Sequence, residues 1–317
     1  MPITAAAIET AYDRITPHIR VTPLLQLRRG DFGLPFAASL KLESLQHSGS
    51  FKARGAFNAL LSQEVPLVGV TAASGGNHGA AVAYAARALG IPARIFVPEI
   101  STPAKIARIR AYGADVSVVG KTYAEARRAC EAWRDETGAL DIHAYDAEPT
   151  IVGQGTLALE WEGQARGLDT LFIAVGGGGL ISGIATWFAG KTRIIGVEPV
   201  SCPSLSAALS AGGPIDVEVG GVAADSLGAR RCGELVYDIC RMAVDDVILV
   251  EDEEIRDAQR RLWREAQIVA EPGGAAALAA LTGGRYTPQR GERVGILVCG
   301  GNADLTALVP PRLATLA

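Results

Sequence analysis

Short apolar segments alternate with longer amphipathic segments along most of the 317-residue chain. The apolar segments have the length of buried strands, and the segments between them have the spacing of amphipathic helices. The pattern predicts strands at residues 67–72, 93–97, 115–119, 171–175, 193–198, 247–250 and 293–299. It predicts helices at residues 78–89, 103–112, 122–136, 150–166, 180–189, 252–266 and 273–281. Continuously apolar strands that alternate with helices indicate an α/β fold whose parallel sheets are covered on both faces.

Residues 171–190 are uncharged and long enough to be considered as a membrane span. Four consecutive glycines at 176–179 interrupt this stretch, and each would weaken a helix by about 1 kcal/mol. We therefore predict a buried strand, a glycine loop and a short helix here, rather than a transmembrane helix.

Composition narrows the classes of protein. The length suggests about two domains. With 30 basic and 34 acidic residues the net charge is −4, which argues against a dedicated nucleic-acid binder. Five widely spaced cysteines form no CxxC pair, so the sequence indicates neither a structural zinc site nor a disulfide framework, and a reducing cytosol fits best. The segment 1–14 lacks a basic start, so no signal peptide is expected.

Three glycine-containing loops follow predicted strands, at residues 73–79, 176–179 and 299–302. Ligands of open parallel sheets bind beyond the carboxyl ends of the strands, so these loops form the candidate site. The first two loops precede helices, where free backbone N–H groups can bind an anion. The four glycines of the second loop could hold a phosphate with backbone groups alone.

Each loop also has a plainer interpretation. The loop at 73–79 could be a polar turn that caps a helix, and Cys299 could be a buried structural cysteine. The glycine loop partly matches a dinucleotide-binding fingerprint with Glu198 as the ribose-binding acid, but Ile181 stands where the third glycine is required.

Lys52 lies in the segment SGSFKARG at residues 48–55. Taken alone, it would be interpreted as a solvated surface lysine. Burial beside Phe51 would instead lower the pKa of its amine and make it a usable nucleophile.

Five motifs together resemble those of the fold type II pyridoxal-phosphate enzymes, in the serine/threonine dehydratase (threonine ammonia-lyase) and serine racemase branch. The motifs are SGSFKARGA (48–56), SGGNHG (74–79), GGGGLISG (176–183), EPGGA (271–275) and CGGN (299–302). Their order and spacing match along nearly the whole chain.

The resemblance implies a tryptophan synthase β-like architecture, with two open, twisted, mostly parallel sheet domains flanked by helices. It implies a large cofactor-binding domain formed by residues 1–60 plus 148–317. A small mobile domain at residues 61–147 would close over the substrate.

The resemblance also implies roles for individual residues. Lys52 would form a Schiff base with pyridoxal 5′-phosphate and take the Cα proton of the substrate, and Cys299 would face the pyridine nitrogen. The cofactor contacts would come from Phe51, Lys52, Asn77, Gly176, Gly177, Gly178, Gly179, Glu271 and Cys299. The substrate contacts would come from Ser74, Gly75, Asn77 and His78, with Ser74 also a candidate catalytic residue.

The activity implied is a β-elimination that converts L-threonine or L-serine into a 2-oxo acid and ammonia. The enzyme would be a cytoplasmic homodimer, without nucleic-acid or membrane partners. A neutral thiol at the ring nitrogen suits elimination, because the departing hydroxide removes the developing negative charge promptly.

Some positions depart from the pattern of this branch. Racemases carry a serine at the position of Gly75, so racemisation should be poor. The divalent-cation site of some relatives pairs a glutamate matching Glu198 with an aspartate where this chain has Ser204, so no metal is predicted. Relatives often have Asp-Gly at Asp225-Ser226. The chain ends soon after the CGGN motif, so no C-terminal regulatory domain is expected.

Several alternative functions remain open at this point. A 3-hydroxyaspartate dehydratase would need a further cation for the second carboxylate, and His47 is one candidate. A serine racemase is disfavoured by Gly75. An NAD-dependent oxidoreductase would leave Lys52 and Asn77 unexplained, and the intact lysine argues against a non-catalytic binding protein.

Overall fold

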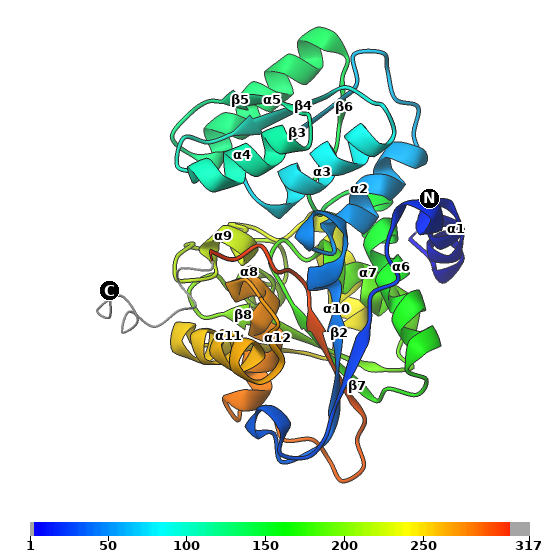
Figure 1. Ribbon diagram of the computed structural model, residues 1–317, viewed down its shortest axis with the longest axis vertical. Helices are drawn as coiled ribbons and strands as arrows, with labels where there is room; N and C mark the ends of the chain where they lie inside the picture. The colour runs from blue at the N-terminus through cyan, green and yellow to red at the C-terminus, as the bar shows by residue number, and fades with distance from the viewer. Residues whose placement is uncertain (1–2, 305–317) are drawn as a thin grey trace, which may run out of the picture.

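The computed structural model describes residues 3–304 and contains two β-sheets flanked by helices (Figure 1). The larger sheet has the strand order β1-β2-β10-β7-β8-β9, and the smaller has the order β5-β4-β3-β6. The larger sheet consists of β1 (Leu24–Leu27), β2 (Ala38–Leu42), β7 (Thr170–Ala174), β8 (Arg193–Pro199), β9 (Asp246–Val250) and β10 (Val294–Val298). The smaller consists of β3 (Val70–Ala73), β4 (Ala93–Val97), β5 (Asp115–Val118) and β6 (Leu140–Asp141).

Within residues 3–304 the strands of both sheets pair in parallel, except that β1 runs antiparallel to β2 at the edge of the larger sheet. Strands β7 and β10, near the middle of the larger sheet, are buried along their whole length. Such strands are apolar on both faces because helices cover both. The predicted α/β fold with mostly parallel sheets is confirmed.

The helices are α1 (Ala5–Ile15), α2 (Lys52–Leu61), α3 (Asn77–Ala88), α4 (Pro103–Ala111), α5 (Tyr123–Thr137), α6 (Glu148–Gln164), α7 (Gly179–Phe188), α8 (Ser204–Ala211), α9 (Ala224–Leu227), α10 (Glu234–Ala243), α11 (Asp252–Ala266) and α12 (Pro272–Thr282). Every predicted helix and strand is present, with small shifts at the ends. The largest shift is at β3, which begins at Val70 because Gly69 adopts a φ of +88° in a turn closed onto the Pro66 carbonyl.

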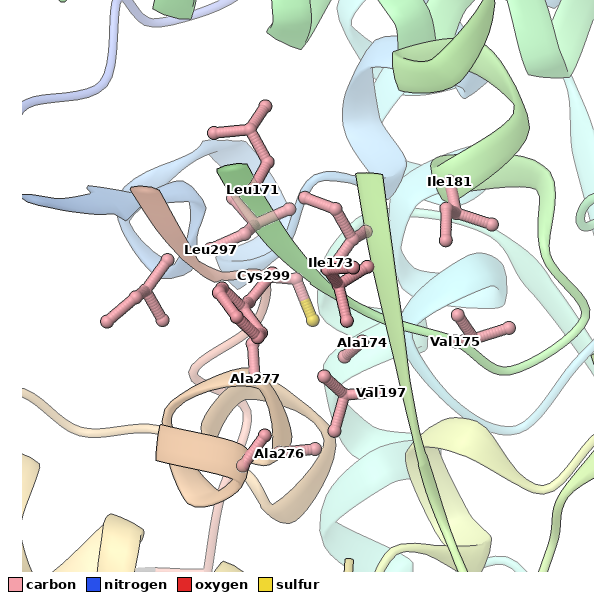
Figure 2. Packing of buried hydrophobic residues seen from close by; sticks show 14 of the residues in the cluster. Leu171, Ile173, Ala174, Val175, Ile181, Val197, Ala276, Ala277, Leu297 and Cys299 are labelled. Carbon is pink, nitrogen blue, oxygen red and sulfur yellow. The ribbon is translucent and has the colours of Figure 1, made fainter. Parts of the chain in front are cut away.

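Two main hydrophobic clusters hold the fold together. The larger packs β7, β8 and β10 against α7 and α12, and Figure 2 shows Ile173, Val197 and Ala277 within it. The second joins α2 and α3 to the smaller sheet. Helix α2 also packs on α6, so it contacts both the helices beside the smaller sheet and those beside the larger sheet (Figure 1). No helix within residues 3–304 combines the length and apolarity needed to cross a membrane.

The smaller sheet, with α3, α4 and α5 beside it, lies above the larger sheet in Figure 1. The division of the chain at residues 60/61 and 147/148, and any motion between the two parts, stay predictions. The expectations about a signal peptide and a regulatory domain concern the chain ends, of which residues 1–2 and 305–317 lie outside the described range.

Candidate active site

A narrow cavity lies at the carboxyl ends of β7 and β10 and brings together every residue predicted to contact the cofactor. Its lining includes Phe51, Lys52, Asn77, Gly176, Gly177, Gly178, Gly179, Glu271 and Cys299. Tyr145, Ser226, Leu227 and Gly273 also line it. A larger cavity of about 1210 Å³ opens beside it, and Gly75, Gly76 and Asn77 are in its wall.

Lys52 is the first residue of α2, and its amine is held in place by one hydrogen bond. Nζ donates to the Ala144 carbonyl over 2.7 Å and lies 5.1 Å from the centre of the Phe51 ring. Burial lowers the pKa of the Lys52 amine to about 8, against the opposing charges of Cys299 and Glu271. A substantial neutral fraction therefore exists near neutral pH, as a nucleophile or base requires.

The glycine loop connects β7 to the first turn of α7. A Cβ at Gly177 would come within 2.3 Å of the Tyr145 ring, and one at Gly179 within 2.6 Å of the Tyr145 carbonyl oxygen. Gly178 has a φ of +89°. Side chains are thus excluded, and the first N–H groups of α7 have no carbonyl partner within the helix. The loop is a backbone cradle of the kind that binds phosphate.

Glu271 is part of a chain of polar contacts above the cavity. Asn77 Nδ2 donates to Glu271 Oε1 over 2.5 Å, and Asn302 Nδ2 donates to Asn77 Oδ1 over 2.7 Å and to the Ser48 carbonyl over 2.9 Å. Burial raises the pKa of the Glu271 carboxyl to about 7, although the hydrogen bond from Asn77 opposes the shift. Glu271 can therefore exchange a proton near neutral pH.

Cys299 follows β10 and is almost completely buried, 3 % exposed. Its thiol donates to the Gly273 carbonyl over 3.4 Å. Figure 2 shows it in the cluster that contains Ile173, Ala174 and Ala277. Burial raises the pKa of the Cys299 thiol, and the charge of Glu271 raises it further. The sulfur is therefore a neutral thiol at physiological pH.

Only some residues of the loop before α3 line the two cavities. Ser74 Oγ accepts from the Gly76 N–H over 3.2 Å, and the His78 ring donates from Nε2 to the Ile142 carbonyl over 2.7 Å. Burial lowers the pKa of His78 to about 3, so the ring is neutral. The side chains of Ser74 and His78 line neither cavity. The backbone N–H of His78, at the start of α3, could bind an anion. The His78 ring is instead hydrogen-bonded to the Ile142 carbonyl.

Gly75 lies where a side chain has no room. A Cβ there would stand 2.0 Å from Ser101 Oγ and 2.7 Å from Val97 Cγ1. The loop therefore presents backbone rather than a second hydroxyl at this position.

Glu198 and Ser204 make hydrogen bonds to the first turn of α8 and to the glycine loop. Glu198 accepts from the N–H groups of Leu205 and Ser206, each over 2.8 Å, and Ser204 Oγ donates to the Gly176 carbonyl over 2.8 Å. The carboxylate that resembled a ribose-binding acid thus caps α8. Within residues 3–304 no group of three or more His, Cys, Asp or Glu side chains could hold a metal ion.

Tyr145 and Asn302 were missed as site residues. Tyr145 lies between β6 and α6 in the segment HAYDAE, which matches none of the five motifs, so no recognised motif marks it. Asn302 belongs to the CGGN motif, where its polar side chain after the glycines was an available signal. His47 lies outside both cavities, stacked on Tyr84 with its Nδ1 2.9 Å from the tyrosine hydroxyl.

Comparisons with known proteins agree with this geometry. The chain is 38% identical over 306 residues to a phenylserine dehydratase of Ralstonia pickettii, covering 94% of this chain and 93% of that protein. It is also 38% identical over 306 residues to an L-threonine ammonia-lyase of Geobacter sulfurreducens, covering 95% and 76% respectively.

Solved structures give the same result. A maize serine racemase superposes with a TM-score of 0.90 at 33% identity, covering 97% of this chain and 96% of the other. A threonine deaminase from T.th. superposes with a TM-score of 0.88 at 37% identity, covering 95% and 99%.

Residues 15–300 match the family described as "Pyridoxal-phosphate dependent enzyme". The resemblance inferred from the five motifs is confirmed, and so is the cofactor. The cavity fits that group, because its lining offers a reactive amine, a glycine cradle for a phosphate and a neutral thiol. The chain belongs to the pyridoxal-phosphate dependent enzymes.

Proposed function

We propose that the protein is an ammonia-lyase that removes water from a β-hydroxy amino acid, L-threonine or L-serine in the first instance. The loss of water across Cα and Cβ leaves an enamine, whose hydrolysis gives a 2-oxo acid and ammonia. The observation that carries this proposal is the convergence of the Lys52 amine, the glycine loop and the Cys299 thiol on one cavity. The likeness to dehydratases and ammonia-lyases supports the reaction class.

The lining residues divide the binding of the cofactor between them. In this proposal the N–H groups of residues 176–179 would bind the phosphate, Asn77 would donate to the 3-hydroxyl oxygen, and Cys299 would lie near the ring nitrogen. Bound pyridoxal phosphate supplies an electron sink that stabilises negative charge at Cα. Cys299 is neutral, so it provides no anion to hold a proton on the ring nitrogen.

Lys52 is the proposed base for the Cα proton. Its lowered pKa of about 8 provides a neutral amine in useful amounts, and the Ala144 carbonyl 2.7 Å away orients Nζ. A base whose pKa lies near the working pH is the most effective in proton transfer.

Gly75 favours elimination over racemisation. Racemisation needs a second acid that returns the proton to the opposite face of Cα. The loop offers no side chain at Gly75, and Ser101 Oγ occupies the space where its Cβ would project.

Three further features belong to the proposal. The part of the chain at residues 61–147 closes over the substrate; in support, Lys105 on α4 and Asp225 on α9 both line the larger cavity and form an ion pair 2.9 Å long. The protein is a homodimer, as is common in the branch that it resembles. It works in the cytoplasm, where five free, buried cysteines suit the reducing conditions.

A product assay tests the reaction. The purified, cofactor-loaded protein is supplied with L-threonine and L-serine, and 2-oxo acid, ammonia and D-amino acid are measured together. The proposal expects equal amounts of 2-oxo acid and ammonia with little D-isomer, and no product from Lys52→Ala. D-serine as the main product would show a racemase instead, and product from the Lys52→Ala variant at the wild-type rate would refute the assigned base.

A further inference from the structure

The larger cavity has a charged wall that the proposed reaction of threonine or serine does not use. No aromatic side chain within residues 3–304 lines this cavity. Its charged lining consists of four cationic residues, Lys105, Arg108, Arg256 and Arg260, and three acidic ones, Asp225, Glu271 and Asp304. Such a wall suits a substrate with an anionic side group better than one with an aromatic side group.

Arg108 is the distinctive member of this wall. Lys105 pairs with Asp225 over 2.9 Å, and Arg256 and Arg260 pair with Glu253 over 3.9 and 2.6 Å. The guanidinium of Arg108 is half-buried and makes no ion pair or hydrogen bond with any residue in the range 3–304. A cation withdrawn from water without a partner is costly, so the position is matched to an anion that arrives with a ligand.

Arg108 also acts on Glu271, a residue that lines both cavities. Arg108 and Lys105 are three residues apart on α4, so they share one face of that helix. Both charges act on the Glu271 carboxyl, which bonds to Asn77. Asn77, Ser226 and Glu271 line both cavities, so a substrate bound at Lys52 can extend into the cavity that Arg108 lines.

We propose that Arg108, assisted by Lys105, binds a carboxylate on the side chain of the substrate, so that the preferred substrate is 3-hydroxyaspartate. This inference rests on the proposed β-elimination and names the substrate class of the same site. The reaction removes the Cα proton and the β-hydroxyl as water, and hydrolysis of the enamine gives oxaloacetate and ammonia. His47, which the sequence offered as the second cation, lies outside the cavity against Tyr84.

The test compares two substrates in one variant. Arg108→Met removes the charge and keeps the length of the side chain. Loss of a charged hydrogen bond corresponds to roughly 10- to 100-fold in KM for L-threo-3-hydroxyaspartate, with the KM for L-threonine changed less than about twofold. Arg108→Lys should restore part of the loss. Arg110→Met is the matched control, because Arg110 lies on α4 but is exposed and outside the cavity wall.

A binding measurement separates recognition from turnover. L-Aspartate has both carboxylates but no β-hydroxyl to lose, and L-2-aminobutyrate lacks the second carboxylate. Their dissociation constants follow from titration of the cofactor absorbance in the loaded protein. Arg108→Met should weaken L-aspartate about as much as it raises the KM for 3-hydroxyaspartate and should leave L-2-aminobutyrate unchanged.

The outcomes distinguish this inference from the proposed function. Turnover of threonine with no preference for 3-hydroxyaspartate would overturn the inference and leave the β-elimination in place. An equal loss for both substrates in Arg108→Met would also overturn it, because Arg108 would then bind a shared group or only support the fold. Failure of both substrates would refute the proposed function, and the L-aspartate titration would still decide the role of Arg108.

Discussion

Two groups of charged residues meet at the first turn of α2, and burial favours the neutral form in both, but the neighbouring charges differ. In one, Arg54 donates to Glu43 and to Glu160, with each pair 2.8 Å apart, and Lys41 donates to Glu160 over 2.5 Å. Burial alone would lower the pKa of Arg54 and raise that of Glu160. The opposite charges around them reverse both shifts, so Arg54 and Glu160 of this structural cluster remain ionised, whereas burial still lowers the pKa of Lys41.

The other group belongs to the candidate site, and the pKa shifts of its members favour their neutral forms. Burial lowers the pKa of Lys52 to about 8, raises that of Glu271 to about 7, and raises that of Cys299. Lys52 and Arg54 lie in the same turn of α2, and the ionised Arg54 is the more deeply buried of the two, so depth in the protein does not account for the difference. The difference in pKa shift follows from the number of opposite charges in contact. Two carboxylates contact Arg54, whereas Nζ of Lys52 donates to a neutral carbonyl.

The two buried lysines should give the largest contrast. Lys52→Ala should lower kcat on the order of 10⁴-fold, because the proposed base for the Cα proton is lost. Lys41→Met, the matched control, should lower the urea midpoint but leave the kcat of the folded protein within about tenfold. The measurements are steady-state kinetics and urea unfolding of both variants. More than a hundredth of the wild-type kcat in Lys52→Ala would remove the distinction between the two lysines.

Arg54→Met should produce the second largest effect, now on stability. It leaves the carboxylates of Glu43 and Glu160 buried without their main partner, which costs about 3–5 kcal/mol. Arg87→Met, an exposed replacement of the same kind, should cost less than about 0.5 kcal/mol. Urea unfolding followed by circular dichroism measures both. Equal costs would mean that the structural cluster adds nothing to stability.

Glu271→Gln should change how stability depends on pH. The pKa of Glu271 is raised to about 7 in the folded protein from 4.5, so wild-type stability falls as pH rises between these values, by about 3 kcal/mol in total. Glutamine does not titrate, and this fall should disappear. Urea unfolding of the two proteins at pH 5 and pH 8 measures the difference. Parallel pH profiles would show that Glu271 is ionised throughout.

Cys299→Ser should have the smallest effect, because it exchanges one neutral group for another. We expect a stability cost of about 1 kcal/mol and a kcat within about tenfold of the wild type. Cys299→Asp, which places a charge at the same buried position, should be much more damaging to both. If the serine variant lost activity as completely as Lys52→Ala, the thiolate rather than the thiol would be the working form.

The same contrast explains what could be predicted from the sequence. Strands β7 and β10 are continuously apolar and were recognised. Strand β2 was missed because Lys41 interrupts its apolar pattern, and that lysine is compatible with burial because it donates to the Thr22 carbonyl and to Glu160 and Gln164, which are distant in sequence. Helix α2 was missed for a related reason, since Arg54 and Gly55 break its apolar face.

The cofactor cavity was predictable because its residues lie in short motifs at the ends of strands. Arg108 and Tyr145 lie outside any motif and reach the cavities through the packing of α4 and of the segment before α6. The orientation of the His78 ring likewise depends on its hydrogen bond to the Ile142 carbonyl, which belongs to a distant segment. Contacts of this kind are determined by tertiary structure, which local spacing does not encode.

The ion pair between Lys105 and Asp225 has a consequence for how ionic strength affects catalysis. Asp225 is 78 % exposed and Lys105 26 %, so added salt screens their attraction and eases the separation of α4 from α9. The same salt weakens the attraction of Arg108 for a carboxylate. On the proposed closure of residues 61–147 and the proposed role of Arg108, product release should quicken with salt while capture of an acidic substrate slows, and the best rate should fall at an intermediate salt concentration.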